Sequence, residues 1–206
     1  MGYPQEIIWN YMKLVFATNN QHKIDEIRSL LNESIELITL KEAGVEQDIP
    51  EPYETLEENA RQKSATIFQL TGNDCFGEDT GLEVEALNGE PGVKSARYAG
   101  DQRSFDDNIS LLLSKLSGQT NRYARFRTVI SLLIAGKETQ FEGICKGQII
   151  AEKRGIGGFG YDPVFIPDGA MRSFAEMGIE EKNKYSHRAR ATEKLVAFLN
   201  NWQQKS

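Results

Sequence analysis

Two adjacent carboxylates followed by a hydroxyl and a glycine make Glu78-Asp79-Thr80-Gly81 well suited to metal-assisted chemistry. Carboxylate oxygens are hard ligands of the kind that Mg²⁺ prefers. A plain turn uses the same residue types, so this segment alone leaves both interpretations open. We predict a tight turn at residues 79–81, flanked by strands over residues 75–78 and 82–87.

A second metal ligand is expected from an acidic segment further upstream, which offers Glu51, Glu54, Glu57 and Glu58. Glu58 has a competing task, because Thr55-Leu-Glu-Glu58 has the form of a capping box that opens a helix. Glu51 stands between two prolines and has no evident structural task. We therefore favour Glu51 as the partner of Asp79 at the metal.

The segment Thr18-Asn-Asn-Gln-His-Lys23 joins a predicted strand to a predicted helix. Unpaired N–H groups at the helix start and Lys23 in its first turn would form an anion site, for which phosphate is the natural ligand. The alternative is that Thr18 or Asn20 only caps the helix. A lysine at the positive end of a helix is unfavourable unless an anion lies nearby, which tips the balance towards the anion site. Lys63 is a further candidate cation, although most helix lysines are simply solvated.

A glycine-rich run with two aromatic rings and a carboxylate, Gly155-Ile-Gly-Gly-Phe-Gly-Tyr-Asp-Pro163, could bind a flat ring. Glycine lets the backbone approach a ligand, and Phe159 and Tyr161 offer faces on which a base could stack. The alternative is a turn anchored by buried rings.

Near the C-terminus, Ser186 is placed to cap the last helix, with His187 and Arg188 in its first turn. These side chains, preceded by Lys182 and Lys184, would donate hydrogen bonds to a ligand that has acceptor oxygens. A buried structural histidine is the alternative for His187 alone.

The elements that must position these groups follow from hydrophobic periodicity. Helices are predicted from about residue 24 to 31, 55 to 70 and 104 to 116, and at the C-terminus around Leu195, Phe198, Leu199 and Trp202. Strands are predicted over residues 12–17 and 35–40, and a hairpin over 125–134 and 139–150. Strands and helices do not alternate strictly, which predicts an α/β (mixed α+β) fold. We expect a long mixed central sheet flanked by helices, in two lobes with the cleft between them.

The composition of the chain argues against some classes of function. The chain has 206 residues, 39% hydrophobic content and a formal net charge of −6. This charge argues against a nucleic-acid polymer as partner, because such binding needs a basic face. No apolar run approaches a membrane span and no export signal is evident, so we expect a cytoplasmic protein without membrane contact. Residues 1–11 are predicted to be a leader or an added extension, and residues 12–206 a single domain with two lobes.

Five motifs in series resemble the inosine/xanthosine triphosphate pyrophosphatase family over residues 12 to about 202. They are Thr18-x-Asn20-x-x-Lys23, residues 78–81, Pro91-Gly-Val-Lys-Ser-Ala-Arg-Tyr-Ala-Gly100, residues 157–163 and Ser186-His-Arg188. The resemblance implies hydrolysis of ITP, dITP and XTP to the monophosphate and pyrophosphate. It also implies a requirement for Mg²⁺, a two-lobed fold around the nucleotide and, usually, a homodimer.

The resemblance also implies roles for individual residues. Asp79 matches the catalytic, metal-linked aspartate that accepts a proton, and Glu51 fits the second metal carboxylate. The remaining residues match substrate contacts: the triphosphate loop Thr18, Asn19, Asn20, Gln21, His22 and Lys23, then Lys63 and Thr80, and the base-binding set Phe159, Gly160, Tyr161, Asp162, Lys182, His187 and Arg188.

The chain departs from the family pattern at three positions. Many members have Asp-Asp-Ser-Gly where this chain has Glu78 and Thr80, and a glycine where Asn19 stands. The longer carboxylate puts a direct metal contact by Glu78 in doubt, whereas the hydroxyl of Thr80 is retained. Two alternative functions stay open: a related nucleotide pyrophosphatase with another modified-base preference, and a non-catalytic nucleotide-binding protein.

Overall fold

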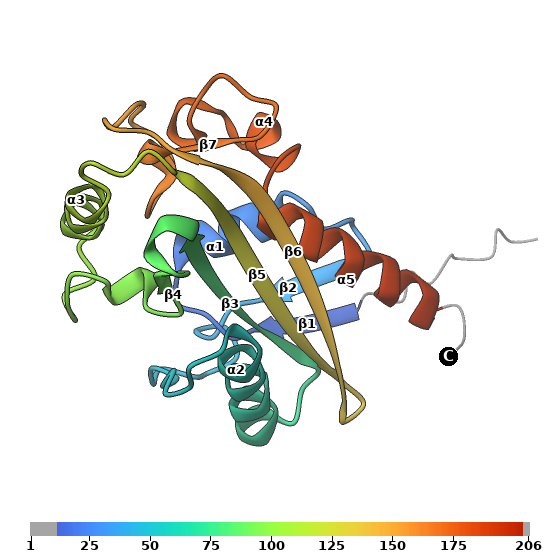
Figure 1. Cartoon of the computed structure of the whole chain (residues 1–206). Coiled ribbons are helices and arrows are strands. Elements are labelled where there is room, and N and C mark those ends of the chain that lie inside the picture. The colour runs from blue at the N-terminus through green and yellow to red at the C-terminus, as the bar shows by residue number, and fades with distance from the viewer. Residues whose placement is uncertain (1–11, 204–206) are drawn as a thin grey trace, which may run out of the picture.

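A curled, seven-stranded mixed sheet forms the centre of the molecule (Figure 1). The computed structural model describes residues 12–203, so the prediction about residues 1–11 lies outside the described residues. The strand order is β2-β1-β3-β5-β6-β7, with β4 paired to β3. Strand β1 is parallel to β2 and β3, and the other pairs are antiparallel. The strands are β1 Met12–Phe16, β2 Ile35–Ile38, β3 Cys75–Val84, β4 Pro91–Gly92, β5 Tyr123–Ile134, β6 Lys137–Ile149 and β7 Phe165–Pro167.

The helices are α1 Gln21–Arg28, α2 Leu56–Thr71, α3 Phe105–Lys115, α4 Ile179–Asn183 and α5 His187–Gln203. Two helices, α1 and α2, begin at the caps that the sequence predicts, whereas the short helix α4 was not predicted. The side chains of Asn20, Thr55 and Ser104 each accept a backbone N–H at the start of α1, α2 and α3, which satisfies donors that a helix leaves unpaired. Helix α1 ends at Arg28, earlier than predicted. None of the helices within residues 12–203 has the length and apolar character to cross a membrane.

Helices α2 and α5 cover opposite faces of the sheet. A Cβ at Gly77 of β3 would meet Ala60 of α2 at 2.3 Å, and a Cβ at Gly143 of β6 would meet His187 of α5 at 2.0 Å. Gly143 of β6 pairs with Thr128 of β5, which pairs with Thr80 of β3, so these three residues form one row across the sheet. Gly77, in a second row, is three positions from Thr80 on β3. Because side chains alternate along a strand, an odd offset puts the two rows on opposite faces. Each helix can approach closely because a glycine leaves room for its backbone.

The predicted turn at residues 79–81 is wrong. Strand β3 runs without a break through this segment and pairs with β5 from Cys75 to Val84. Gly81, one source of the turn prediction, instead admits strand β4, because a Cβ there would meet the Gly92 carbonyl oxygen at 2.6 Å. The second predicted strand is also too long, since residues 85–87 form a 3₁₀ turn.

The other predicted elements are confirmed. The hairpin joins β5 and β6 through Ala135 and Gly136, which both have positive φ, as a two-residue turn requires. Apolar side chains gather in two main clusters. One contains Leu14, Ile27 and Leu195 around β1, α1 and α5, and the other contains Ile109 and Phe165 around α3 and β7. The candidate site adjoins the second of these clusters through Leu82, Phe126 and Tyr161, and it adjoins a third, smaller cluster through Ala17 and Leu40.

Candidate functional site

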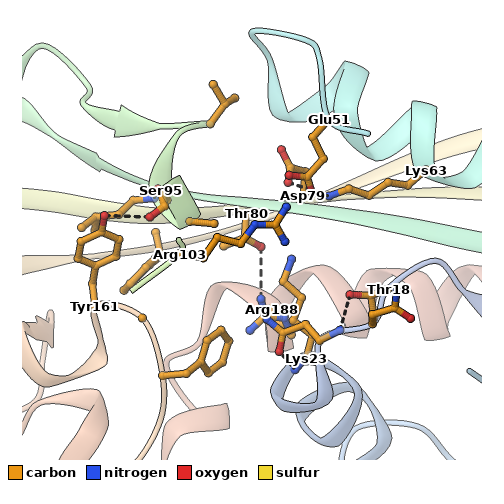
Figure 2. A pocket seen from close by; sticks show the side chains of 18 of the residues that line it. Thr18, Lys23, Glu51, Lys63, Asp79, Thr80, Ser95, Arg103, Tyr161 and Arg188 are labelled. Carbon is orange, nitrogen blue, oxygen red and sulfur yellow. Dashed lines mark hydrogen bonds and ion pairs between the residues drawn. The ribbon is translucent and has the colours of Figure 1, made fainter. Parts of the chain in front are cut away.

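Most of the predicted site residues line one cavity of about 380 Å³. Its size is typical of sites for small molecules. Its lining includes Thr18, Asn19, Asn20, Lys23, Glu51, Lys63, Asp79, Thr80, Phe159, Gly160, Tyr161, Asp162, His187 and Arg188. In Figure 2, Glu51 and Lys63 lie beside Asp79, and Tyr161 lies on the opposite side of the view.

Asp79 projects from β3 to the face covered by α2. Its Oδ1 accepts a hydrogen bond of 3.0 Å from Lys63 Nζ, and its Oδ2 accepts one of 3.3 Å from Asn59. Burial raises the pKa of Asp79 even though Lys63 opposes the rise. A carboxylate with a raised pKa accepts a proton more readily, so its surroundings suit a general base.

Glu51 and Asp79 both contact the Lys63 ammonium. Burial alone would lower the pKa of Lys63, but the two carboxylates outweigh it and raise the pKa. The carboxylates of Glu51 and Asp79 thus both point towards the positive charge of the Lys63 ammonium. Within residues 12–203 no group of three or more His, Cys, Asp or Glu side chains is arranged to hold a metal. Two carboxylates nevertheless fit Mg²⁺, which commonly takes one or two and completes its shell with water and phosphate oxygens.

Glu78 points to the opposite face and belongs to a different network. Arg188 donates two hydrogen bonds to it, Nε to Oε2 at 2.9 Å and Nη2 to Oε1 at 2.8 Å. Lys23 Nζ lies 3.4 Å from Oε1. Burial alone would raise the pKa of Glu78, but Arg188 and Lys23 hold it well below its ordinary value. The adjacent carboxylates of Asp79 and Glu78 therefore belong to separate hydrogen-bond networks. Glu78 orients the cationic side chains of Arg188 and Lys23.

The glycine-rich segment forms a wall of the cavity that lies against residues 18–23. Asp162 accepts a hydrogen bond of 2.9 Å from the Phe159 N–H, and Lys182 lies 2.6 Å from the same carboxylate. Gly158 has φ 70°, and a Cβ there would meet Asp162 Oδ2 at 2.2 Å, so only glycine fits. Tyr161 is buried and donates to the Ser95 carbonyl at 2.9 Å. Tyr161 thus anchors the wall, which leaves Phe159 as the more accessible ring.

The loop before α1 approaches this wall. Thr18 Oγ1 accepts the Asn20 N–H at 3.2 Å, and Asn20 Oδ1 accepts the Lys23 N–H at 3.3 Å. The His22 ring stacks on Phe159, with centroids 5.0 Å apart and planes 9° apart. The predicted phosphate loop and the predicted base wall are therefore neighbours across the cavity.

Comparison with known proteins places the whole arrangement in one family. A model described as the Ham1 family matches residues 14–198. The chain belongs to the Ham1 family. A dITP/XTP pyrophosphatase from Flavobacterium psychrophilum is 52% identical over 190 residues, which cover 92% of this chain and 100% of that protein. One from Porphyromonas gingivalis is 52% identical over 91% of this chain and 97% of its own length.

Solved Ham1 structures have the same fold. A HAM1 protein from Coxiella burnetii matches with a TM-score of 0.85 at 36% identity, covering 92% of this chain and 99% of that one. The Staphylococcus aureus Ham1 protein matches with a TM-score of 0.83 at 39% identity, covering 92% and 98%. The family resemblance and the mixed fold predicted from sequence are confirmed.

Three predicted site residues of this Ham1 chain do not line the cavity. Gln21 is exposed and donates to Asp25 at 2.6 Å. His22 is exposed and stacks on Phe159, which lines the cavity. Lys182 lies behind the wall, where it also pairs with Glu26 at 2.7 Å.

Glu26 is the member of this network that sequence reasoning missed. It is 8% exposed and contacts both Lys182 and Arg188, so it joins α1 to the two cations of the C-terminal segment. The available signal was its place between Ile24 and Ile27 on the buried side of α1. A carboxylate there requires cationic partners, because burial of an unpaired charge is costly.

Glu26 predicts an acid-sensitive contribution to stability. Burial alone would raise its pKa, but Arg188 and Lys182 outweigh burial and lower the pKa from 4.5 to about 2. The folded state therefore binds this proton less tightly than the unfolded state, and the contribution is complete above about pH 4.5 and is lost as pH falls towards 2. Urea unfolding of wild type and Glu26→Gln should give free energies that converge over this range. A difference that stays constant with pH would contradict the assignment.

Proposed function

We propose that this chain hydrolyses the deaminated purine nucleoside triphosphates ITP, dITP and XTP to the monophosphate and pyrophosphate. The observation that carries the proposal is the position of Asp79. It lies 3.0 Å from Lys63, in a cavity lined by both the predicted phosphate loop and the predicted base wall. The names of the relatives, dITP/XTP pyrophosphatase, support two of these substrates, dITP and XTP.

The proposed reaction is attack of water on the α-phosphorus. A bond forms between the water oxygen and phosphorus, and the bond to the bridging oxygen breaks, so that pyrophosphate leaves with the electron pair. Asp79 accepts the proton that the water loses, and Lys23 and Lys63 offset phosphate charge. Catalysis of phosphoryl transfer rests mainly on such positioning and charge neutralisation.

Mg²⁺ is the cofactor we propose, held by Asp79 and Glu51. When bound, it would supply a hard positive charge that neutralises the triphosphate and acidifies a coordinated water. The family resemblance also supports a homodimer, and we include it in the proposal together with the cytoplasmic location expected from the sequence.

We propose that the protein selects its substrate by recognising the edge of the purine base that carries oxygen at position 6. Hypoxanthine and xanthine present an acceptor there, whereas adenine presents an amino donor. His187 lines the cavity and stacks on Phe126 at 4.6 Å. Burial, aided by Arg188, lowers the pKa of His187 well below 6.5. Its ring is therefore neutral near pH 7 and carries one N–H donor.

Replacing His187 by phenylalanine should reduce the preference for ITP over ATP by about tenfold or more, because a donor that favours O6 is removed. The aromatic stack on Phe126 can be retained, so most of the packing is preserved. The measurement is the ratio of kcat/KM for ITP and ATP, with thermal unfolding recorded for both proteins. An unchanged ratio would remove His187 from base recognition.

The function itself is tested by pyrophosphate release from ITP, XTP, dITP, ATP and GTP, with and without Mg²⁺. We expect release from the first three only, and only with the metal. Preference for a different modified base would favour the related pyrophosphatase. Nucleotide binding without pyrophosphate release would favour the non-catalytic alternative.

A further inference from the structure

Most positive charge in the cavity is already neutralised by the protein itself. Four cationic side chains line the cavity: Lys23, Lys63, Arg103 and Arg188. Lys23 pairs with Glu78, Lys63 pairs with Glu51 and Asp79, and Arg188 pairs with Glu78 and Glu26. A triphosphate carries several negative charges, so it needs positive charge beyond these balanced pairs.

Arg103 differs from the other three. Its side chain has no hydrogen-bond or ion-pair partner among residues 12–203. It lies just before Ser104, the N-cap of α3, on the loop that also brings Ser95 and Ala96 to the cavity. Figure 2 shows it on the cavity wall between Tyr161 and Asp79. Its guanidinium is therefore available to a ligand.

The backbone of Arg103 is held in an unfavourable conformation. Its φ is +52°, in the left-handed region that suits glycine and disfavours a long side chain. Such outliers persist where the surrounding structure enforces them and are frequent at ligand sites. An arginine at this position therefore has a cost that a glycine would avoid, and a ligand contact would explain its presence.

We propose that Arg103 is a substrate-binding residue that contacts the phosphate chain of the nucleotide. The planar guanidinium can donate two parallel hydrogen bonds to one phosphate group, which a lysine cannot do. This inference rests on the proposed function for the identity of the substrate. Its probe is inorganic tripolyphosphate, which has the phosphate chain but neither base nor ribose.

The test compares Arg103→Ala with wild type by calorimetric titration of tripolyphosphate and by steady-state hydrolysis of ITP. We expect tripolyphosphate to bind about tenfold more weakly and KM for ITP to rise by a similar factor, because a charge-assisted hydrogen bond is lost. The change in kcat should be smaller than about threefold, since the group binds the chain in both ground and transition states. Arg103→Lys should recover part of the affinity.

Two further variants separate binding from structure and from general charge. Arg103→Gly relieves the unfavourable φ, so it should match or exceed wild type in thermal stability while binding tripolyphosphate as weakly as the alanine variant. Lys94→Ala removes one charge from an exposed residue of the same loop that does not line the cavity, and should leave tripolyphosphate affinity nearly unchanged. Equal affinity in wild type and Arg103→Ala, or an equal loss in Lys94→Ala, would overturn the proposal.

The failure of the proposed function would look different. A wild-type chain that binds tripolyphosphate but releases no pyrophosphate from ITP would refute the enzyme activity, and the binding comparison would still test Arg103. Conversely, normal ITP hydrolysis with no effect of Arg103→Ala on either measurement would refute Arg103 alone.

Discussion

Replacing Asp79 by asparagine should lower kcat for ITP hydrolysis by about 10²- to 10⁴-fold, the usual loss when a general base is removed. The amide keeps the shape of the carboxyl group but cannot accept a proton at neutral pH. Asp79 is 6% exposed, and both of its oxygens are oriented by Lys63 and Asn59. The loss should therefore appear in kcat at saturating ITP and Mg²⁺.

A matched control is Asp48→Asn, which removes the same charge from the cavity lining. Asp48 is exposed and accepts a hydrogen bond of 3.2 Å from Asn19, and nothing in the proposed reaction uses it as a base. Its kcat should change far less than that of Asp79→Asn. Near-normal turnover by Asp79→Asn at saturating Mg²⁺ would show that another group takes the proton.

Replacing Glu78 by glutamine should reduce the free energy of unfolding by about 3 kcal/mol or more, because it breaks a buried ion pair and leaves charge uncompensated. Glu78 is 1% exposed, and its carboxylate contacts Arg188 and Lys23. Arg188 is equally buried, so water cannot replace the lost partner. Activity should also fall, since both cations line the cavity.

Urea unfolding of wild type, Glu78→Gln and Glu78→Asp measures this effect. Glu78→Asp keeps the negative charge, so its loss of stability should be smaller. The m-value should stay constant if only native-state stability changes. A loss below about 1 kcal/mol in Glu78→Gln would show that the pair contributes little beyond its desolvation cost.

Local sequence was sufficient for the elements whose signals are local. The caps at Asn20, Thr55 and Ser104 each satisfy N–H groups of the helix that follows directly, so their effect is readable from neighbouring residues. The hairpin at Ala135-Gly136 likewise depends on adjacent strands. The error at residues 79–81 arose because Asp-Thr-Gly is compatible with both turn and strand. The distant strand β5 decided between them by pairing with the whole segment.

The sequence by itself determined the chemical inventory: a predicted phosphate loop ending at Lys23, the carboxylate Asp79 and an aromatic ring at Phe159, in an order that identified the family. Tertiary structure alone decided how these groups are paired. Alternation along β3 sends Asp79 towards Lys63 and Glu78 towards Arg188, and the approach of α1 to α5 gives Glu26 its cationic partners. Such pairings join residues far apart in the chain, so no local pattern encodes them. They also show which cation of the cavity remains available, because Arg103, unlike Lys23, Lys63 and Arg188, has no side-chain partner among residues 12–203.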